Sequence, residues 1–255
     1  MISLRESLAD AMQVMLDTVS GTEPRGITTG FPHFDQLVRG LHPGSLTVLA
    51  SRPSLGKTAF ALNIVRNLMG RKPEIPILYC SSLSSTELTF QLLTILSGVR
   101  CSYDHDLRGD ESARLTAAIS TVQDYPLCFG DSRTQDEVFF RRTADSQAEK
   151  HFELIIMDPV PAERLSRLKT LAEKLEVPAV ALVSVGEKNG GIPGSDMVDT
   201  VIYLNRSRRE SETGTGAPVS LTVTRNRFGL CGTCRMNFIP QTMQFWSFDN
   251  EDAEE

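Results

Sequence analysis

The 255-residue sequence lacks the features that mark membrane-spanning, secreted and uniformly basic proteins. No apolar run approaches the ~18–20 residues that a membrane-spanning helix needs. The first six residues include an acid and no continuous apolar stretch, so we expect no secretory signal. The five cysteines are few and odd in number, which favours reduced thiols and a cytoplasmic location. A net charge of −6 excludes a uniformly basic nucleic-acid binder but leaves room for a local basic channel.

The composition is that of an ordinary globular protein, with 40% hydrophobic and 23% charged residues, and the length is enough for one large α/β domain or two small ones. Near the N-terminus, apolar residues at helical spacing predict a helix of about five turns. This stripe comprises Leu4, Leu8, Met12, Met15 and Val19. A linker rich in helix breakers follows at residues 20–26. The stripe suits either a helix of the domain's own core or an arm that docks on a neighbouring subunit.

From residue 46 onward, short apolar runs alternate with helical patterns. The predicted strands span residues 46–50, 75–81, 127–129, 154–158 and 177–185. The predicted helices span residues 58–68, 86–96, 112–122, 136–150 and 161–175. Because continuous apolar strands that alternate with helices form buried parallel sheets, we predict an α/β fold with helices on both faces of a mostly parallel sheet.

After residue 201 the helical patterns stop, and strands are predicted to finish the sheet in antiparallel pairing. They span residues 201–204, 219–224, 234–238 and 243–248. Trp246, in the last of them, is expected to lie in the core. The sequence has no repeats and no low-complexity linkers. The simplest domain organisation is therefore an N-terminal arm at 1–25, one α/β domain at 26–248 and an acidic tail at 249–255.

The most specific motif lies between the first strand and the first helix of this predicted domain. A Gly-Lys-Thr triplet opens the helix, as in a phosphate-binding loop whose backbone N–H groups surround phosphates. Lys57 would then reach the β- and γ-phosphates, and the Thr58 hydroxyl would hold Mg²⁺. The usual motif has a glycine where this chain has Ser51, so an ordinary strand-to-helix turn is the alternative. The loop comprises Ser51, Arg52, Pro53, Ser54, Leu55, Gly56, Lys57 and Thr58.

Asp158 is the second candidate for the Mg²⁺ site. It ends the buried strand 154–158, where a Walker B acid orders the Mg²⁺ shell. Many strands end in Asp as a loop or cap residue, and it is the phosphate loop upstream that favours the metal role. Cys231 and Cys234 also have metal-ligand spacing, but the sequence has no second such pair, so we expect no zinc site.

With these motifs, the sequence resembles the ATPase domain of DnaB-type replicative helicases. The resemblance is strongest over residues 26–64, which include the phosphate loop, and it continues through 168–178 to 225–229. It implies a RecA-like P-loop NTPase fold, ATP and Mg²⁺ as ligands, and assembly into a ring. The N-terminal stripe occupies the place of the family's linker helix, which packs on the adjacent subunit. The family's N-terminal helical domain has no counterpart in this sequence, so we expect a weak ring.

The family's functional residues match this chain unevenly. Lys57, Thr58 and Asp158 stand at the nucleotide and Mg²⁺ positions. Arg225 and Arg227 stand where the family has its basic pair, which includes the arginine finger that reaches a neighbour's γ-phosphate. The alternative is that both arginines are exposed charges of a strand or a turn.

Two positions near the γ-phosphate depart from the family. The family's general base is a Glu that follows the strand after the phosphate loop, and this chain has Leu83 there, which cannot accept a proton. Glu87 lies one helical turn on, where the family also has an acid, so it is not an obvious replacement. The family's Ser-Gln, whose Gln senses the γ-phosphate, is Val183-Ser184 here.

The two loops that line the family's DNA channel are short in this chain. The helix from residue 161 begins almost directly after Asp158, and residues 186–194 replace a longer basic stretch. The remaining basic candidates are Lys188 and the arginines between residues 206 and 209. Six to ten phosphate contacts are an ordinary requirement for tight DNA binding, so single-stranded DNA is expected to bind weakly at most.

Three functions remain open. The first is an ATP-binding, DnaB-like protein with weak or absent hydrolysis that acts as a ring or regulatory subunit, as a homo-oligomer or within a helicase ring. The second is an active ATP-dependent 5′→3′ DNA helicase. The third is a KaiC- or RadA-like recombination ATPase, which shares the fold. Leu83 and the short loops favour the first.

Overall fold

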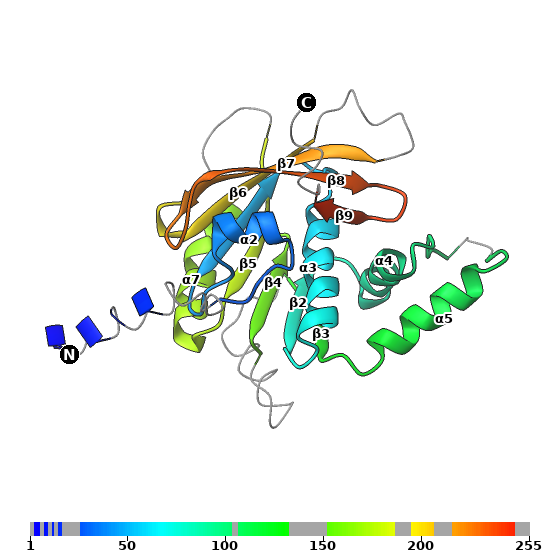
Figure 1. The fold of residues 1–255 in the computed structure, drawn as a ribbon, viewed down its shortest axis with the longest axis horizontal. Coiled ribbons are helices and arrows are strands. Elements are labelled where there is room, and N and C mark those ends of the chain that lie inside the picture. The colour runs from blue at the N-terminus through cyan, green and yellow to red at the C-terminus, as the bar shows by residue number, and fades with distance from the viewer. Residues whose placement is uncertain are drawn as a thin grey trace.

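The computed structural model describes residues 3–5, 8–9, 12, 15–16, 26–103, 107–132, 152–186, 195–206 and 216–247. These residues form a nine-stranded sheet in the order β3-β2-β4-β5-β1-β6-β7-β8-β9 (Figure 1). The strands are β1 Leu46–Ser51, β2 Ile77–Ser81, β3 Leu127–Asp131, β4 Leu154–Asp158, β5 Ala179–Ser184, β6 Thr200–Arg206, β7 Ala217–Asn226, β8 Gly232–Ile239 and β9 Gln244–Ser247. The mostly parallel sheet predicted from the sequence is therefore confirmed.

The last strands complete the sheet in antiparallel pairing, as predicted. The antiparallel pairs are β6–β7, β7–β8 and β8–β9. β6 is the strand at which the pairing changes, since it also pairs in parallel with β1, a contact that the sequence did not predict.

Helices cover both faces of the sheet, as predicted. They are α2 Pro32–Val38, α3 Lys57–Arg71, α4 Ser85–Ser97, α5 Glu111–Val122 and α7 Leu165–Leu175, with short 3₁₀ turns at Ala162–Arg164 and Ser195–Met197. The predicted helix 161–175 thus begins as a 3₁₀ turn. The helix predicted at 136–150 lies outside the described residues, and α2 was not predicted.

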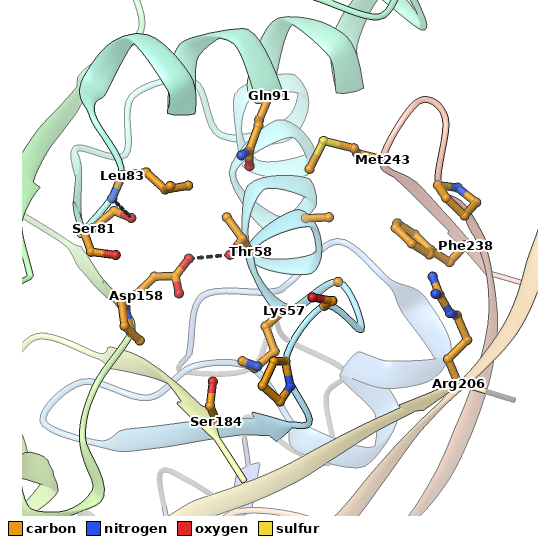
Figure 2. A pocket seen from close by; sticks show the side chains of 17 residues that line it. Lys57, Thr58, Ser81, Leu83, Gln91, Asp158, Ser184, Arg206, Phe238 and Met243 are labelled. Carbon is orange, nitrogen blue, oxygen red and sulfur yellow. Dashed lines mark hydrogen bonds between the residues drawn. The ribbon is translucent and has the colours of Figure 1, made fainter. Parts of the chain in front are cut away.

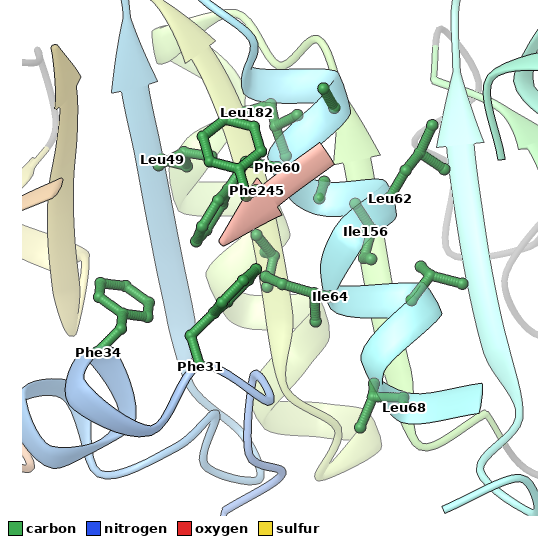
Figure 3. Close-up of a cluster of buried hydrophobic side chains, with 14 of the residues drawn as sticks. Phe31, Phe34, Leu49, Phe60, Leu62, Ile64, Leu68, Ile156, Leu182 and Phe245 are labelled. Carbon is green, nitrogen blue, oxygen red and sulfur yellow. The ribbon is translucent and has the colours of Figure 1, made fainter. Parts of the chain in front are cut away.

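Two hydrophobic clusters pack against opposite faces of the sheet. β1 alternates between them, since Leu49 faces the cluster of α2, α3 and α4 whereas Val48 faces the cluster of α7. In the first cluster, the Phe60 ring on α3 lies between Phe31 and Phe245, with ring centroids 5.3 and 5.2 Å away (Figure 3). A strand buried on both faces explains the continuous apolar runs in the sequence.

The buried side chain of Asn63 connects α3 to β9. Its amide nitrogen donates to the carbonyl oxygen of Met243 at 2.8 Å, and its amide oxygen accepts from the N–H of Phe245 at 3.1 Å. Trp246 follows, but it is 50% exposed and the Arg66 guanidinium lies 5.2 Å from its ring. The expectation that Trp246 lies in the core is therefore wrong, because alternate residues of β9 face opposite sides and Phe245 takes the buried side.

The described residues of the N-terminal stripe are helical and exposed. Leu4, Leu8, Met12 and Met15 are 76%, 53%, 62% and 68% exposed, so these four side chains do not lie in the core of this chain. Val19 and the tail at 249–255 lie outside the described residues. No helix within the described residues is long and apolar enough to cross a membrane.

Candidate functional site

The carboxyl ends of four parallel strands meet at one edge of the sheet. Ser51 of β1 is in register with Ser184 of β5, and Ser81 of β2 is in register with Asp158 of β4. Ligands of open α/β sheets bind outside this edge, since the loops that follow the strands converge there. The sequence motifs at 51–58 and 154–158 are thus brought together at one place.

The loop between β1 and α3 turns sharply before the helix begins. Gly56 precedes the first residue of α3 and has a φ of 104°, and Ser54 has a φ of 63°. A side chain at Gly56 would be strained by this φ and would lie 3.4 Å from the rings of Phe238 and Phe245. The N–H groups of the first turn of α3 lack helical partners and carry partial positive charge, which suits an anion.

Lys57 is buried at the start of α3 and folds back over the loop. Its ammonium donates to the Ser51 hydroxyl at 3.1 Å, and to the carbonyl oxygens of Ser51 and Arg52 at 3.3 and 3.4 Å. Burial lowers the pKa of Lys57, and the charge of Asp158 opposes this shift. Ser51, which replaces the first glycine of the usual motif, therefore contributes a hydroxyl acceptor that glycine would lack.

Thr58 and Asp158 form the second half of the site. The Thr58 hydroxyl donates to the Asp158 carboxylate at 2.6 Å, and the buried Tyr79 hydroxyl donates to the same oxygen at 3.3 Å. Burial raises the pKa of Asp158, while the two hydroxyls and the charge of Lys57 lower it in part. Hydroxyl and carboxylate oxygens are the ligands that Mg²⁺ prefers, so this donor pair fits that ion.

These residues border a cavity of about 850 Å³ (Figure 2). Figure 2 shows Asp158 and Thr58 across the cavity from Phe238 and Arg206, with Lys57 between the two sides. Phe238, Pro240 and Met243 from the C-terminal hairpin line it too, and the Arg206 guanidinium lies 5.7 Å from the Phe238 ring. Neither this apolar wall nor Gln91 of α4 could be predicted, because nothing in their local sequence patterns distinguishes them from core residues.

Leu83 and Ser184 also line the cavity. The Leu83 N–H donates to the Ser81 hydroxyl at 3.1 Å, and its half-buried side chain packs against the first hydrophobic cluster. Glu87 does not line the cavity. Its carboxylate accepts from the Ser84 N–H and hydroxyl at 2.8 and 2.7 Å in a capping box that begins α4, and these hydrogen bonds lower its pKa.

Arg225 and Arg227 border a different cavity, of about 620 Å³. The Arg227 guanidinium lies 3.2 Å from the carboxylate of Asp199, which also binds the ammonium of Lys169 at 2.7 Å. Arg225 donates to the carbonyl oxygen of Asp196 at 2.9 Å. Burial raises the pKa of Asp199, but the hydrogen bonds from Lys169, the Leu46 N–H and Arg227 outweigh it and the pKa is lowered. The predicted site residues thus fall into two groups.

The two cysteines with metal-ligand spacing differ in burial. Cys231 is exposed and Cys234 is buried, and within the described part of the chain no three His, Cys, Asp or Glu side chains are grouped to hold a metal ion. Lys188 and the arginines at 208 and 209 lie outside the described residues.

Comparison with known proteins identifies a family whose model includes the phosphate loop at residues 51–58. The model of the family described as DnaB-like helicase C terminal domain matches residues 26–191. The replicative DNA helicase DnaB of Treponema pallidum is 30% identical over 243 residues, covering 84% of this chain and 54% of that protein. That of Leifsonia xyli is 25% identical over 272 residues, covering 91% and 59%. The chain therefore spans a little over half the length of these relatives.

Two solved structures have the same fold. The ATPase domain of G40P superposes with a TM-score of 0.78 at 18% identity, covering 95% of this chain and 99% of that one. A DnaB-like replicative helicase, studied with its interactions with primase, superposes with a TM-score of 0.79 at 19% identity, covering 98% and 68%. These likenesses confirm the fold class that the sequence predicted.

Proposed function

The chain belongs to the DnaB-like helicase C-terminal domain family, and from that premise we propose that it binds ATP with Mg²⁺ and hydrolyses ATP slowly, as a ring or regulatory subunit. The observation that carries the proposal is the convergence of Lys57, Thr58 and Asp158 on one cavity at the carboxyl edge of the sheet. Family membership argues against the third hypothesis, a KaiC- or RadA-like recombination ATPase.

The two ends of the cavity suit the two ends of a nucleotide. The first turn of α3 and the ammonium of Lys57 would bind the phosphates, while Thr58 and Asp158 would hold Mg²⁺. When bound, Mg²⁺ neutralises phosphate charge. At the other end, the Phe238 ring and the Arg206 guanidinium offer a stacking surface for a base.

We propose slow hydrolysis because no acidic side chain that the structure describes near the expected γ-phosphate position is free to act as the general base. Leu83 occupies the position of the family's general base, and Asp158 is bound by the Thr58 and Tyr79 hydroxyls. Glu87 is held in its capping box. An active helicase remains the second candidate, favoured by the Gly-Lys-Thr triplet at residues 56–58, and turnover separates the two.

Assembly through the N-terminal arm is also part of the proposal. The exposed side chains of Leu4, Leu8, Met12 and Met15 would dock on a neighbouring copy or on a helicase subunit. Arg225 and Arg227 lie in the cavity away from the phosphate loop and would face the neighbour's nucleotide. Single-stranded DNA would bind weakly, because the channel loops are short.

The binding proposal is tested by titration calorimetry with Mg²⁺–ATP. The wild type should bind in the micromolar to millimolar range, and Lys57→Ala should lose binding while keeping the wild-type melting temperature. The matched control is Lys174→Ala, which also removes a lysine but lies on α7, outside the cavity lining. Equal binding by wild type and Lys57→Ala would overturn the assignment.

A further inference from the structure

Gln91 is a polar side chain that neither the sequence motifs nor the family resemblance explain. It lies in the second turn of α4 and lines the same cavity as Lys57 and Thr58. Figure 2 shows its amide directed from α4 into the cavity, on the side where Thr58 and Leu83 lie. The Gln91 Oε1 atom is buried and has no hydrogen-bond partner among the described residues.

Such an orphaned acceptor is unusual in a folded protein. Buried polar groups are almost always hydrogen-bonded, and an exception calls for an explanation such as a functional role or an absent partner molecule. Within the described residues, two other buried side-chain atoms lack a partner, His42 Nε2 and the Tyr125 hydroxyl, and neither residue lines this cavity. Of the three, only Gln91 belongs to the lining of the cavity where the proposed substrate would lie.

The surroundings of Gln91 define the kind of partner that it can serve. Leu83 supplies an apolar wall, and Asp158, the one acid in the described cavity lining, accepts from Thr58 and Tyr79. A neutral amide offers an acceptor and two N–H donors, and a half-turn of the amide exchanges them. It can therefore accept a hydrogen bond from a water molecule or donate one to a phosphate oxygen.

We propose that Gln91 positions the water that attacks the γ-phosphate, and this inference rests on the proposed function. In the step, the oxygen of that water bonds to the γ-phosphorus as the bond to the bridging oxygen breaks, and its electron pair leaves on ADP. One water proton passes to a γ-phosphate oxygen, and the other is hydrogen-bonded to Gln91 Oε1. The amide takes up no proton, as with the glutamine that orients water in GTPases, so the residue aids hydrolysis without acting as a base.

The test measures binding as well as turnover. ADP with aluminium fluoride imitates the transferring phosphoryl group and its attacking water, whereas ADP alone needs neither. Calorimetry with Mg²⁺ should show that Gln91→Ala binds ADP–aluminium fluoride at least tenfold more weakly than wild type, with ADP affinity within twofold. Steady-state phosphate release should show kcat reduced at least tenfold and KM within twofold.

Two further variants separate positioning from a structural role. Gln91→Glu keeps the shape and adds a group that can accept a proton, so its kcat should rise with pH across the carboxyl titration, whereas the wild-type kcat should not. Thr89→Ala is the matched control, because Thr89 is half-buried on the same helix, is not part of the cavity lining, and its hydroxyl donates to the Ser85 carbonyl oxygen at 2.8 Å. It should bind both ligands as wild type does.

Each result supports or overturns the inference. Wild-type affinity of Gln91→Ala for ADP–aluminium fluoride would overturn it, as would equal losses for ADP and for ADP–aluminium fluoride. A wild-type protein without turnover and without preference for ADP–aluminium fluoride would also overturn it. Where Gln91→Ala melts early, Gln91→Asn serves instead, since it keeps the amide and withdraws it by one methylene. Failure of the proposed function is distinct: ADP would then bind equally to wild type and Lys57→Ala.

Discussion

Replacing Leu83 by Glu should accelerate ATP hydrolysis. General-base assistance contributes roughly 10²–10⁴-fold to a rate, which is about 3–5 kcal/mol of barrier. Leu83 lines the cavity from the turn after β2 and is half-buried, so a carboxylate there would have a raised pKa and would be a better base. Ser184, which is shorter than the family's glutamine, would limit the gain. We therefore expect an increase of about tenfold to a hundredfold.

The assay is steady-state phosphate release, with Leu83→Gln as the matched control. Glutamine has the size of glutamate but cannot accept a proton, so Leu83→Gln should leave kcat within about threefold of wild type. Adding Lys57→Ala to Leu83→Glu and to Leu83→Gln measures the phosphate that contaminating ATPases release. Equal rates for Leu83→Glu and Leu83→Gln would refute the reasoning, and so would wild-type turnover of several per second that disappears in Lys57→Ala.

Three further predictions follow from the other groups of residues. Leu8→Asp combined with Met12→Asp should lower the mass seen by light scattering with ATP and leave the melting temperature unchanged, because both side chains are exposed. Phe238→Leu should weaken Mg²⁺–ATP binding about fivefold in calorimetry, since stacking on the ring contributes about 1 kcal/mol. Asp199 has a lowered pKa in the folded state, so its stabilising effect is present above its ordinary pKa and is lost as the pH falls toward the folded value. Asp199→Asn should therefore reduce the urea midpoint near pH 7 more than near pH 3; an equal reduction at both would contradict this.

The α/β fold was predictable because its signal is local. Strands such as β4 are continuously apolar, since both faces of the sheet are covered, and the helices between them show helical spacing. α2 was missed because its seven residues carry only two buried side chains, Phe34 and Val38, too few to define a period. The pairing of β6 with β1 depends on a contact between distant segments, which a local pattern does not encode.

Part of the candidate site could be predicted from the sequence, and part could not. Lys57, Thr58 and Asp158 were found because a short motif fixes two of them and a strand end fixes the third. Gln91 and Phe238 come from elements whose sequences predict only a helix and a strand. They reach the cavity because α4 packs against α3, and because β8 pairs with β9, which also packs against α3. Their roles stay predictions until the variants are measured.

The hydrogen bonds of Asn63 have a consequence for how copies of this chain can associate. β9 ends the sheet, and an end strand with free N–H and carbonyl groups invites strand addition and aggregation. Here the Phe245 N–H and the Met243 carbonyl oxygen are already bound to the Asn63 amide from α3. An incoming strand would have to break both bonds within the buried side of the domain. Two backbone groups at this border are thus already bound within the domain, which disfavours strand addition at β9.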